Sequence, residues 1–338
     1  MRRLVIGVLV IAGIGAALAG FEIRKRIYEP HKAYDTPEQF VDIPVGTGTM
    51  AIGRRLIDAG VVADERTFRA ALWWTGRARA LQAGEYRFDR PLAAVEVVDT
   101  LARGDIYTRR ITFPEGLTIA EMARIYESGE FGAAASFIEA GRDASIIRDL
   151  DPLAPDLEGY LFPDTYAVPR RAPAGRLVAL MVNRFRATHT EDWRRRAQEQ
   201  GLTTREVVTL ASLVEKETAK AEERPLVAAV YRNRLRIGMG LQADPTIIYA
   251  LQKAGRYDGN IRRQDLAFDS PYNTYRHPGL PPGPIAAPGR ASLEAALVPA
   301  RVRYLYFVSR NDGSHVFAET LAEHNRNVHE YQVLYFRR

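Results

Sequence analysis

Residues 203–218 have the hydrophobic pattern of a helix with one buried side. The apolar positions recur at i, i+3 and i+7, as in a core-facing stripe. The stripe consists of Val207, Leu210 and Val214. Thr203 and Glu206 have the spacing of a capping box, which predicts that the helix begins there.

Extending this stripe by one turn reaches Glu217, while Glu215 lies at its flank, one turn past Ala211. A carboxylic acid at the end of an apolar stripe is poorly solvated when charged, so its pKa should rise towards the range of a proton donor near neutral pH. The opposite side is predicted to face water: Arg205, Thr209, Ser212 and Lys216. The alternative is that both glutamates are solvated helix charges, paired with Lys216, Lys220 or Arg224.

The hydrophobic pattern before residue 110 predicts a small α+β domain over residues 41–110. Strands are expected at 41–46 and 84–88, and helices at 50–59, 67–75 and 93–102. The order of strand, Pro-x-Gly and helix at its start recurs from residue 111 to residue 126. Trp73 and Trp74 are predicted to lie in the core, with stacking on sugar rings as the alternative.

Residues 111–338 are predicted to form a larger, mixed α/β domain. Helices are expected across 130–200 and at 225–237, 247–252, 291–297 and 321–334, with strands at 304–308 and 316–317. The segment 156–166 interrupts the first helical region with aromatic and acidic residues. Such a composition is common where polyhydroxylated ligands bind, but an ordinary turn between helices has it too. The glycine- and proline-rich stretch 270–289 predicts a long irregular loop, which is usually functional.

The composition limits the class of protein. The chain has 338 residues, enough for two domains, and 46% of them are hydrophobic, which excludes a disordered chain. It contains no cysteine, which excludes disulfides, thiol nucleophiles and cysteine-bound metals. The net charge of +6 favours anionic surroundings such as a membrane surface, a cell-wall polymer or nucleic acid.

The N-terminus predicts a membrane anchor over residues 1–23, followed by a linker over residues 24–40. Two arginines precede an uncharged run from Leu4 to Phe21, which as a helix spans about 27 Å, close to the thickness of a bilayer core. A cleaved signal peptide ending near Ala19 is the alternative. The short basic tail favours a cytoplasmic N-terminus, with the rest of the chain outside the membrane.

Several long motifs resemble the endolytic murein transglycosylase (YceG-like) family. They are Gly-Glu-Tyr-Arg-Phe from residue 84, Glu-Gly-Tyr-Leu-Phe-Pro-Asp-Thr-Tyr from 158, Ala-Ser-Leu-Val-Glu-Lys-Glu-Thr from 211, Asn-Arg-Leu-Arg-Ile-Gly-Met-Gly-Leu-Gln-Ala-Asp-Pro-Thr from 233, Tyr-Asn-Thr-Tyr from 272 and Gly-Leu-Pro-Pro-Gly-Pro-Ile from 279. The resemblance covers nearly the whole chain in order. One departure is Pro284, at a position where the family usually has a small residue.

The resemblance implies an anchor in the inner membrane, a LysM-like domain, and a periplasmic catalytic domain that cuts nascent peptidoglycan strands internally. The family's catalytic acid corresponds to Glu217. It protonates the glycosidic oxygen and then takes a proton from the muramyl 6-hydroxyl, which closes a 1,6-anhydro ring. The resemblance further implies substrate-binding roles for Gln242, Asn273 and Tyr275, with fixing of the loop as the alternative for each. It implies peptidoglycan strands and peptidoglycan synthases as partners, and no cofactor or metal.

Three other functions compete with this hypothesis. A hydrolytic muramidase needs a second carboxylate, and Glu223, Asp244 or Asp269 are candidates. A non-catalytic wall-binding protein would rely on the small domain alone. A metal enzyme is disfavoured because His315, His324 and His329 lack the spacing of ligands on one helix face. An exported domain rarely meets nucleic acid, so the charge is not taken as evidence for a nucleic-acid partner.

Overall fold

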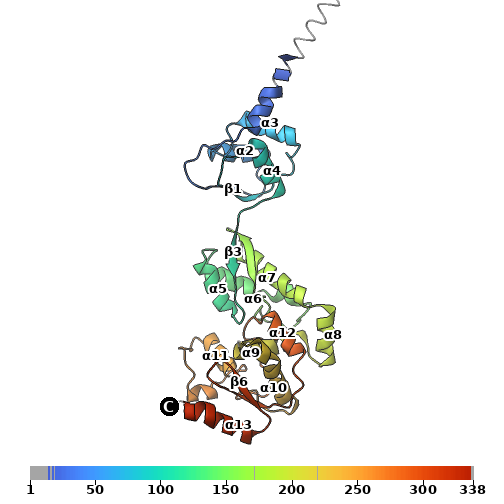
Figure 1. Ribbon diagram of the computed structural model, residues 1–338, viewed down its shortest axis with the longest axis vertical. Helices are drawn as coiled ribbons and strands as arrows, with labels where there is room; N and C mark the ends of the chain where they lie inside the picture. The colour runs from blue at the N-terminus through green and yellow to red at the C-terminus, as the bar shows by residue number, and fades with distance from the viewer. Residues whose placement is uncertain (1–13, 16, 19, 171, 219, 336–338) are drawn as a thin grey trace, which may run out of the picture. The chain divides into compact units, whose positions relative to one another are not determined.

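The structure is a computed structural model that describes residues 14–335 except 16, 19, 171 and 219 (Figure 1). Its fold is of the mixed α+β kind, with many helices and three two-stranded sheets in the described part of the chain. The described residues form two compact units. The first comprises residues up to Arg109 together with Ala167–Arg170, and the second comprises the remainder.

In the first unit, two helices separate two antiparallel strands along the chain, and a third helix follows the second strand. Its elements are β1 (Gln39–Ile43), α2 (Thr49–Asp58), α3 (Glu65–Thr75), β2 (Gly84–Phe88) and α4 (Ala94–Arg103). Gln39 lies opposite Phe88 in the sheet, and Ile43 lies opposite Gly84. The helices and strands that the sequence predicts here are present, with ends displaced by a few residues.

The residues predicted to form a linker instead belong to this first unit. Residues 20–28 are helical, and Ile27 is fully buried in the core. His31 forms a bridge with Leu92, and the hydroxyl of Tyr34 donates to the carbonyl of Phe88. The prediction of a tether over 24–40 was wrong because its few apolar side chains are enough to anchor it to the core.

The prediction that the tryptophan pair is buried was also wrong. The side chain of Trp73 is 77% exposed and that of Trp74 is 46% exposed. Trp74 contacts Tyr28, and its indole nitrogen donates to the tyrosine hydroxyl over 3.2 Å. The core on this side of α3 is filled by Phe68, Ala71 and Leu72 instead.

Most of the predicted anchor, residues 1–23, lies outside the described residues. In the part of the chain that the structure describes, no helix is both long enough and apolar enough to span a bilayer.

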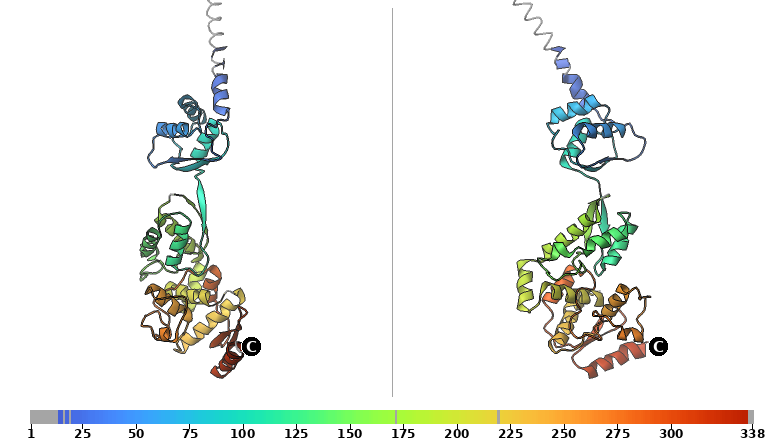
Figure 2. Two further views of the ribbon diagram at one scale, coloured as in Figure 1. Left: turned by 90° about the vertical axis from the view of Figure 1, so that its left-hand side faces the viewer. Right: turned by 180° about the vertical axis from the view of Figure 1, so that it is seen from behind.

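The second unit begins with a helical part and continues into the helices around α9. Strands β3 (Thr108–Thr112) and β4 (Thr165–Pro169) have residues in both units. The first helices of the second unit are α5 (Ile119–Ser128), α6 (Ala134–Arg142), α7 (Ala174–Thr188) and α8 (Glu191–Glu199). Then follow α9 (Thr204–Glu217), α10 (Arg224–Arg236), α11 (Asp244–Lys253), α12 (Arg290–Leu297), β5 (Tyr306–Ser309), β6 (His315–Ala318) and α13 (Leu321–Val328). Figure 2 shows the antiparallel β5–β6 hairpin and α13, in red, packed together near the C-terminus.

Helix α9 is the central element of the second unit. It packs against α8, α10, α11 and α12, and the labels of α10 and α12 lie close to it in Figure 1. Every residue from Val207 to Val214 is buried, including Thr209 and Ser212. The predicted water-facing side is therefore wrong at these two positions. The hydroxyl of Ser212 donates to the carbonyl of Thr209 and accepts from the amide of Ile285, so this polar group is satisfied without water.

The segment 156–166 is a buried connection rather than an exposed loop. Tyr160 is almost fully buried, and its hydroxyl donates to the carboxylate of Asp151 over 2.6 Å. The segment ends in β4, which pairs with β3 and which the sequence pattern did not predict. The aromatic residues here are part of the core, so the segment does not form an open sugar-binding surface.

The predicted repeat of strand, turn and helix is present in both units. Gly46 follows β1 and Gly116 follows β3, and each adopts a positive φ, near +83° and +78° respectively. A residue with a side chain rarely adopts this conformation, which explains the glycine at the same place in both turns.

Candidate active site

Helix α9 ends at Glu217, so this glutamate lies at the junction between a buried helix and an extended segment. The capping box at the other end is present: the hydroxyl of Thr203 accepts from the amide of Glu206, whose carboxylate accepts from the amide of Thr203. Thr218 is extended, with φ near −141°. The helix therefore presents the carboxyl group of Glu217 from a rigid support.

The carboxyl group of Glu217 is held by a tyrosine from the next helix. The hydroxyl of Tyr231, on α10, donates to Glu217 Oε1 over 2.6 Å. Burial raises the pKa of Glu217 to about 6; the bond from Tyr231 opposes this rise, and the nearby charge of Asp244 adds to it. Glu217 thus exchanges its proton near neutral pH, as the sequence pattern suggested.

Two basic side chains act on the same carboxyl group from further away. The charges of His315 and Arg234 both lower the pKa of Glu217. The guanidinium of Arg234 is buried and donates to the carbonyls of Leu305 and Leu241. His315 is held through its Nδ1 by the carboxylate of Glu223 at 2.7 Å. These contacts hold both side chains in place.

Two motifs that are far apart in the sequence meet beside this acid. The backbone amide of Gln242 donates to the backbone carbonyl of Thr274. The hydroxyl of Thr274 accepts from the amide of Ala243 and shares a hydrogen bond with the hydroxyl of Thr246. The irregular loop after residue 270 is thereby attached to the start of α11, as one half of the candidate site.

Gln242 and Tyr275 are the predicted binding residues that reach the surface of this half. Gln242 is exposed and has a φ of +49°, in the left-handed region that residues with a side chain rarely adopt. Such strain is often found at functional sites. Tyr275 is 36% exposed, and its hydroxyl donates to Asp244 Oδ1 over 2.7 Å.

Asn273, the third predicted binding residue, is fully buried. Its amide nitrogen donates to the carbonyls of Leu266 and Phe268, and its amide oxygen accepts from the backbone of Tyr275. These bonds use the side chain within the loop, so its placement favours the loop-fixing alternative.

Glu215 has a different environment from Glu217. Its carboxylate accepts from Arg224 over 3.2 Å and from the amide of Gly289 over 2.9 Å. Glu215 pairs with Arg224, as the alternative for this helix expected, but its side chain is only 6% exposed, so it is not the solvated charge of that alternative. The bond from Gly289 attaches the end of the 270–289 loop to α9. Glu215 is therefore placed as a structural residue.

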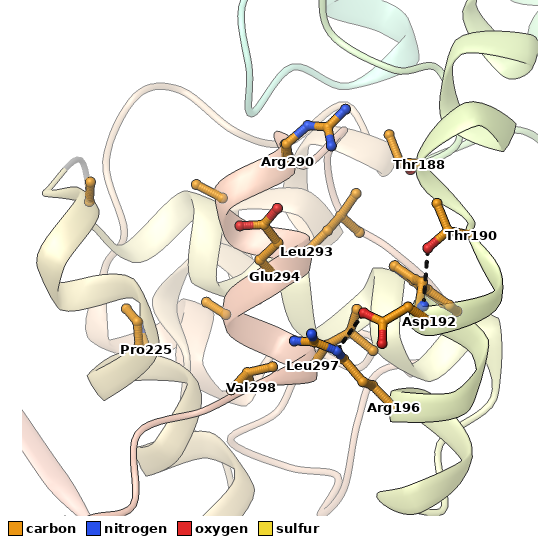
Figure 3. A pocket seen from close by; sticks show the side chains of 14 residues that line it. Thr188, Thr190, Asp192, Arg196, Pro225, Arg290, Leu293, Glu294, Leu297 and Val298 are labelled. Atoms are coloured by element: carbon orange, nitrogen blue, oxygen red, sulfur yellow. Dashed lines mark hydrogen bonds and ion pairs between the residues drawn. The ribbon is translucent and has the colours of Figure 1, made fainter.

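A cavity of about 570 Å³ elsewhere in the second unit does not include this site. Figure 3 shows it between α8, α12 and the start of α10, lined in part by Thr190, Arg290 and Glu294. Its Asp192 and Arg196 form an ion pair of 2.7 Å. Neither Glu217 nor Tyr231 lines it.

No pattern in the sequence indicated that Tyr231, Arg234 and His315 belong to this site. Tyr231 is separated from Glu217 by 14 positions and reaches it only because α10 packs against α9. The only signal in the sequence was the expectation that residues 225–237 form a partner helix for residues 203–218. His315 was considered for a metal site instead.

A glutamic acid of raised pKa at the end of a buried helix, bound by the hydroxyl of Tyr231 and acted on by the charge of Asp244, defines a candidate general-acid site. The chain belongs to the YceG-like family, whose model matches residues 41–330.

Named relatives extend this result. The chain is 32% identical over 334 residues to an endolytic murein transglycosylase of Bacillus subtilis, in a match that covers 94% of this chain and 90% of the relative. It is 30% identical to an endolytic murein transglycosylase of Streptococcus pneumoniae, of which it spans only 58%. The fold is similar to the crystal structure of a yceG-like protein from Listeria monocytogenes, with a TM-score of 0.58, 30% identity, and coverage of 86% of this chain and 98% of that one.

Proposed function

We propose that this chain is a membrane-anchored endolytic murein transglycosylase in which Glu217 is the only general acid and base. The observation that carries the proposal is the protonatable carboxyl group of Glu217, with a pKa of about 6, at the end of a rigid helix and bound by Tyr231. Relatives with the same named activity over most of the chain support it.

In this mechanism Glu217 first donates its proton to the oxygen that links a muramyl residue to the next sugar. As the bond breaks, the carboxylate accepts the proton of the muramyl 6-hydroxyl, whose oxygen attacks the anomeric carbon. The products are a 1,6-anhydromuramyl end and a free sugar hydroxyl, and no water is consumed. A pKa near 6 suits both steps, since the group must give and take a proton at similar pH.

Gln242 and Tyr275 are proposed to bind the sugar hydroxyls and acetamides, because both side chains are accessible and lie on the half of the site built by the loop. Asn273 is proposed to hold that loop in place. The small unit is proposed to be the LysM-like domain, and residues 1–23 the single-pass anchor in the inner membrane, with the catalytic unit in the periplasm. Peptidoglycan synthases are proposed partners, since the strands to be cut are newly made.

A hydrolytic muramidase is the closest competing function. Among its three candidate second carboxylates, Glu223 is occupied by His315, and Asp269 is an exposed partner of Arg276. Asp244 acts electrostatically on Glu217, so it is the carboxylate that a hydrolytic mechanism would use.

Product analysis separates the two mechanisms. Uncrosslinked peptidoglycan strands are incubated with the full-length protein in water enriched in oxygen-18, and the new ends are identified by mass spectrometry. We expect anhydromuramyl ends without the heavy isotope. Reducing ends that carry oxygen-18 would contradict the proposal in favour of hydrolysis, and intact strands would favour a wall-binding role.

The pH dependence of cleavage gives a second test. Glu217 must be protonated to act as the acid, so kcat/KM should fall as the pH rises through about 6. Replacing Tyr231→Phe removes a hydrogen-bond donor that stabilises the charged form of Glu217. The pKa of Glu217 should rise, and the fall in kcat/KM should occur at higher pH. Replacing Asp244→Asn removes a negative charge, so the pKa of Glu217 should fall and kcat/KM should decline at lower pH. If both variants shifted the pH profile of kcat/KM in the same direction, the assignment of Glu217 as the titrating acid would be contradicted.

A further inference from the structure

A second cavity in the same unit, of about 490 Å³, has the character of a binding site for charged groups. It is lined by α5 and α6, by the segment that contains Asp156 and Glu158, and by the C-terminal end of α11 and the residues after it. None of the residues around Glu217 lines it. The proposed cleavage of a glycan strand leaves this cavity without a role.

A buried carboxyl group forms part of the wall of this cavity. Glu158 is 9% exposed; its Oε1 accepts from the amide of Ile119 and its Oε2 from the hydroxyl of Tyr249. Burial raises the pKa of Glu158 to about 8, so the group is largely protonated at neutral pH. It can therefore donate a hydrogen bond as well as accept one.

Four other charged side chains line the cavity. Arg142 is paired with Glu139, and Asp156 Oδ1 accepts from the backbone amide of Glu158. Arg124, Lys253 and Asp156 have no ion-pair partner in the described part of the protein. Arg124 and Lys253 are exposed on its rim, and Lys253 also lies over the ring of Tyr249 at 5.6 Å. Among the residues that the structure describes, no carboxylate lies within 4.0 Å of either cation, and no cation lies within 4.0 Å of Asp156. A cavity with free charges of both signs fits a ligand that carries carboxylates together with amide or amino groups.

Where a stem peptide is attached, the lactyl carboxyl group of the muramyl residue is in an amide bond, and the sugars offer only neutral groups. The peptides themselves carry free carboxylates and amides. The cavity also lies within reach of such a peptide. Helix α11 runs from Asp244, beside Glu217, to Lys253 in the cavity. Nine helical steps cover about 14 Å, and about four extended residues cover the same distance.

We propose that this cavity binds the stem peptide of the strand that is being cut. Arg124 and Lys253 would bind its carboxylates, and Asp156 with Glu158 would bind its amide or amino groups. This inference rests on the proposed function, because it assumes that the glycan lies at Glu217.

The test compares strands that carry intact stem peptides with the same strands after an amidase has removed the peptides. The test variant combines Arg124→Met and Lys253→Met. The control combines Arg301→Met and Arg303→Met, which removes two exposed charges of the same unit that line none of the cavities described above. Circular dichroism establishes that both variants fold.

We expect wild type and control to prefer the peptide-bearing strands. The test variant should lose at least about tenfold in kcat/KM on those strands, because a hydrogen bond to a charged group is worth about one such factor. Its activity on peptide-free strands should not change. Equal loss on both substrates, or no preference in wild type, would overturn the inference. Failure of wild type to cut either substrate would contradict the proposed function itself, and the inference with it.

Discussion

Replacing Glu217→Gln should lower the rate of strand cleavage by about a thousandfold or more. One proton transfer by a positioned side chain contributes about 10²–10⁴ in rate, and Glu217 is proposed to carry out both transfers. A glutamine side chain at this position keeps the size of the glutamate and can still accept the bond from Tyr231, so the geometry is retained. The measurement is the rate of release of new ends from uncrosslinked strands.

The same substitution should leave the fold intact or stabilise it, which separates lost chemistry from lost structure. The pKa of Glu217 is higher in the folded chain, at about 6, than the ordinary value of 4.5. The charged form therefore destabilises the fold above pH 6, and this penalty disappears below pH 4.5. Glu217→Gln should gain up to about 2 kcal/mol at pH 7, since one pKa unit corresponds to about 1.4 kcal/mol.

Glu222→Gln is the matched control, because Glu222 is an exposed carboxylate five positions away. We expect it to retain the activity of wild type. Strand cleavage by Glu217→Gln at a rate near that of wild type would refute the role of Glu217, whatever its effect on stability.

Local patterns predicted much of the fold because helices and their caps depend on nearby residues. The capping box at Thr203 is present, and so is the glycine-containing turn at Gly46 that recurs at Gly116. The apolar stripe of this helix, extended by one turn, predicted that Glu217 has a raised pKa, as it does. It failed for Thr209 and Ser212, because periodicity assumes that a helix has one wet side and α9 is surrounded by other helices.

Features that depend on packing between distant segments could not be predicted in this way. The contact of Tyr231 with Glu217 exists only once α10 has docked on α9, and His315 approaches from a hairpin almost 100 positions away. The exposure of Trp73 has a similar origin, since other apolar residues of α3 already fill the core. Composition gives an average tendency for tryptophan, but the position of the helix decides which side faces inward.

The loop from 270 to 289 depends on one glycine outside it, and Gly159→Ala should strongly destabilise the second unit. Gly159 has a φ of +82°, and a Cβ atom there would lie 2.4 Å from Pro284 Cβ and 3.0 Å from Val208 Cγ1. Strain in a left-handed residue costs about 1–2 kcal/mol. Overpacking against a rigid proline ring adds about 1–3 kcal/mol.

A total of about 3 kcal/mol corresponds to a fall in Tm of roughly 10 °C for the thermal transition of this unit. Gly279→Ala is the matched control, because Gly279 also has a positive φ, +93°, but no atom lies within 4 Å of the added Cβ. We expect the control to show only the smaller cost of backbone strain. Equal falls in Tm would mean that the contact with Pro284 contributes nothing. A larger fall for Gly159→Ala, relieved by adding Pro284→Gly, which removes the Cβ atom that clashes, would show that the proline of this loop packs against Gly159.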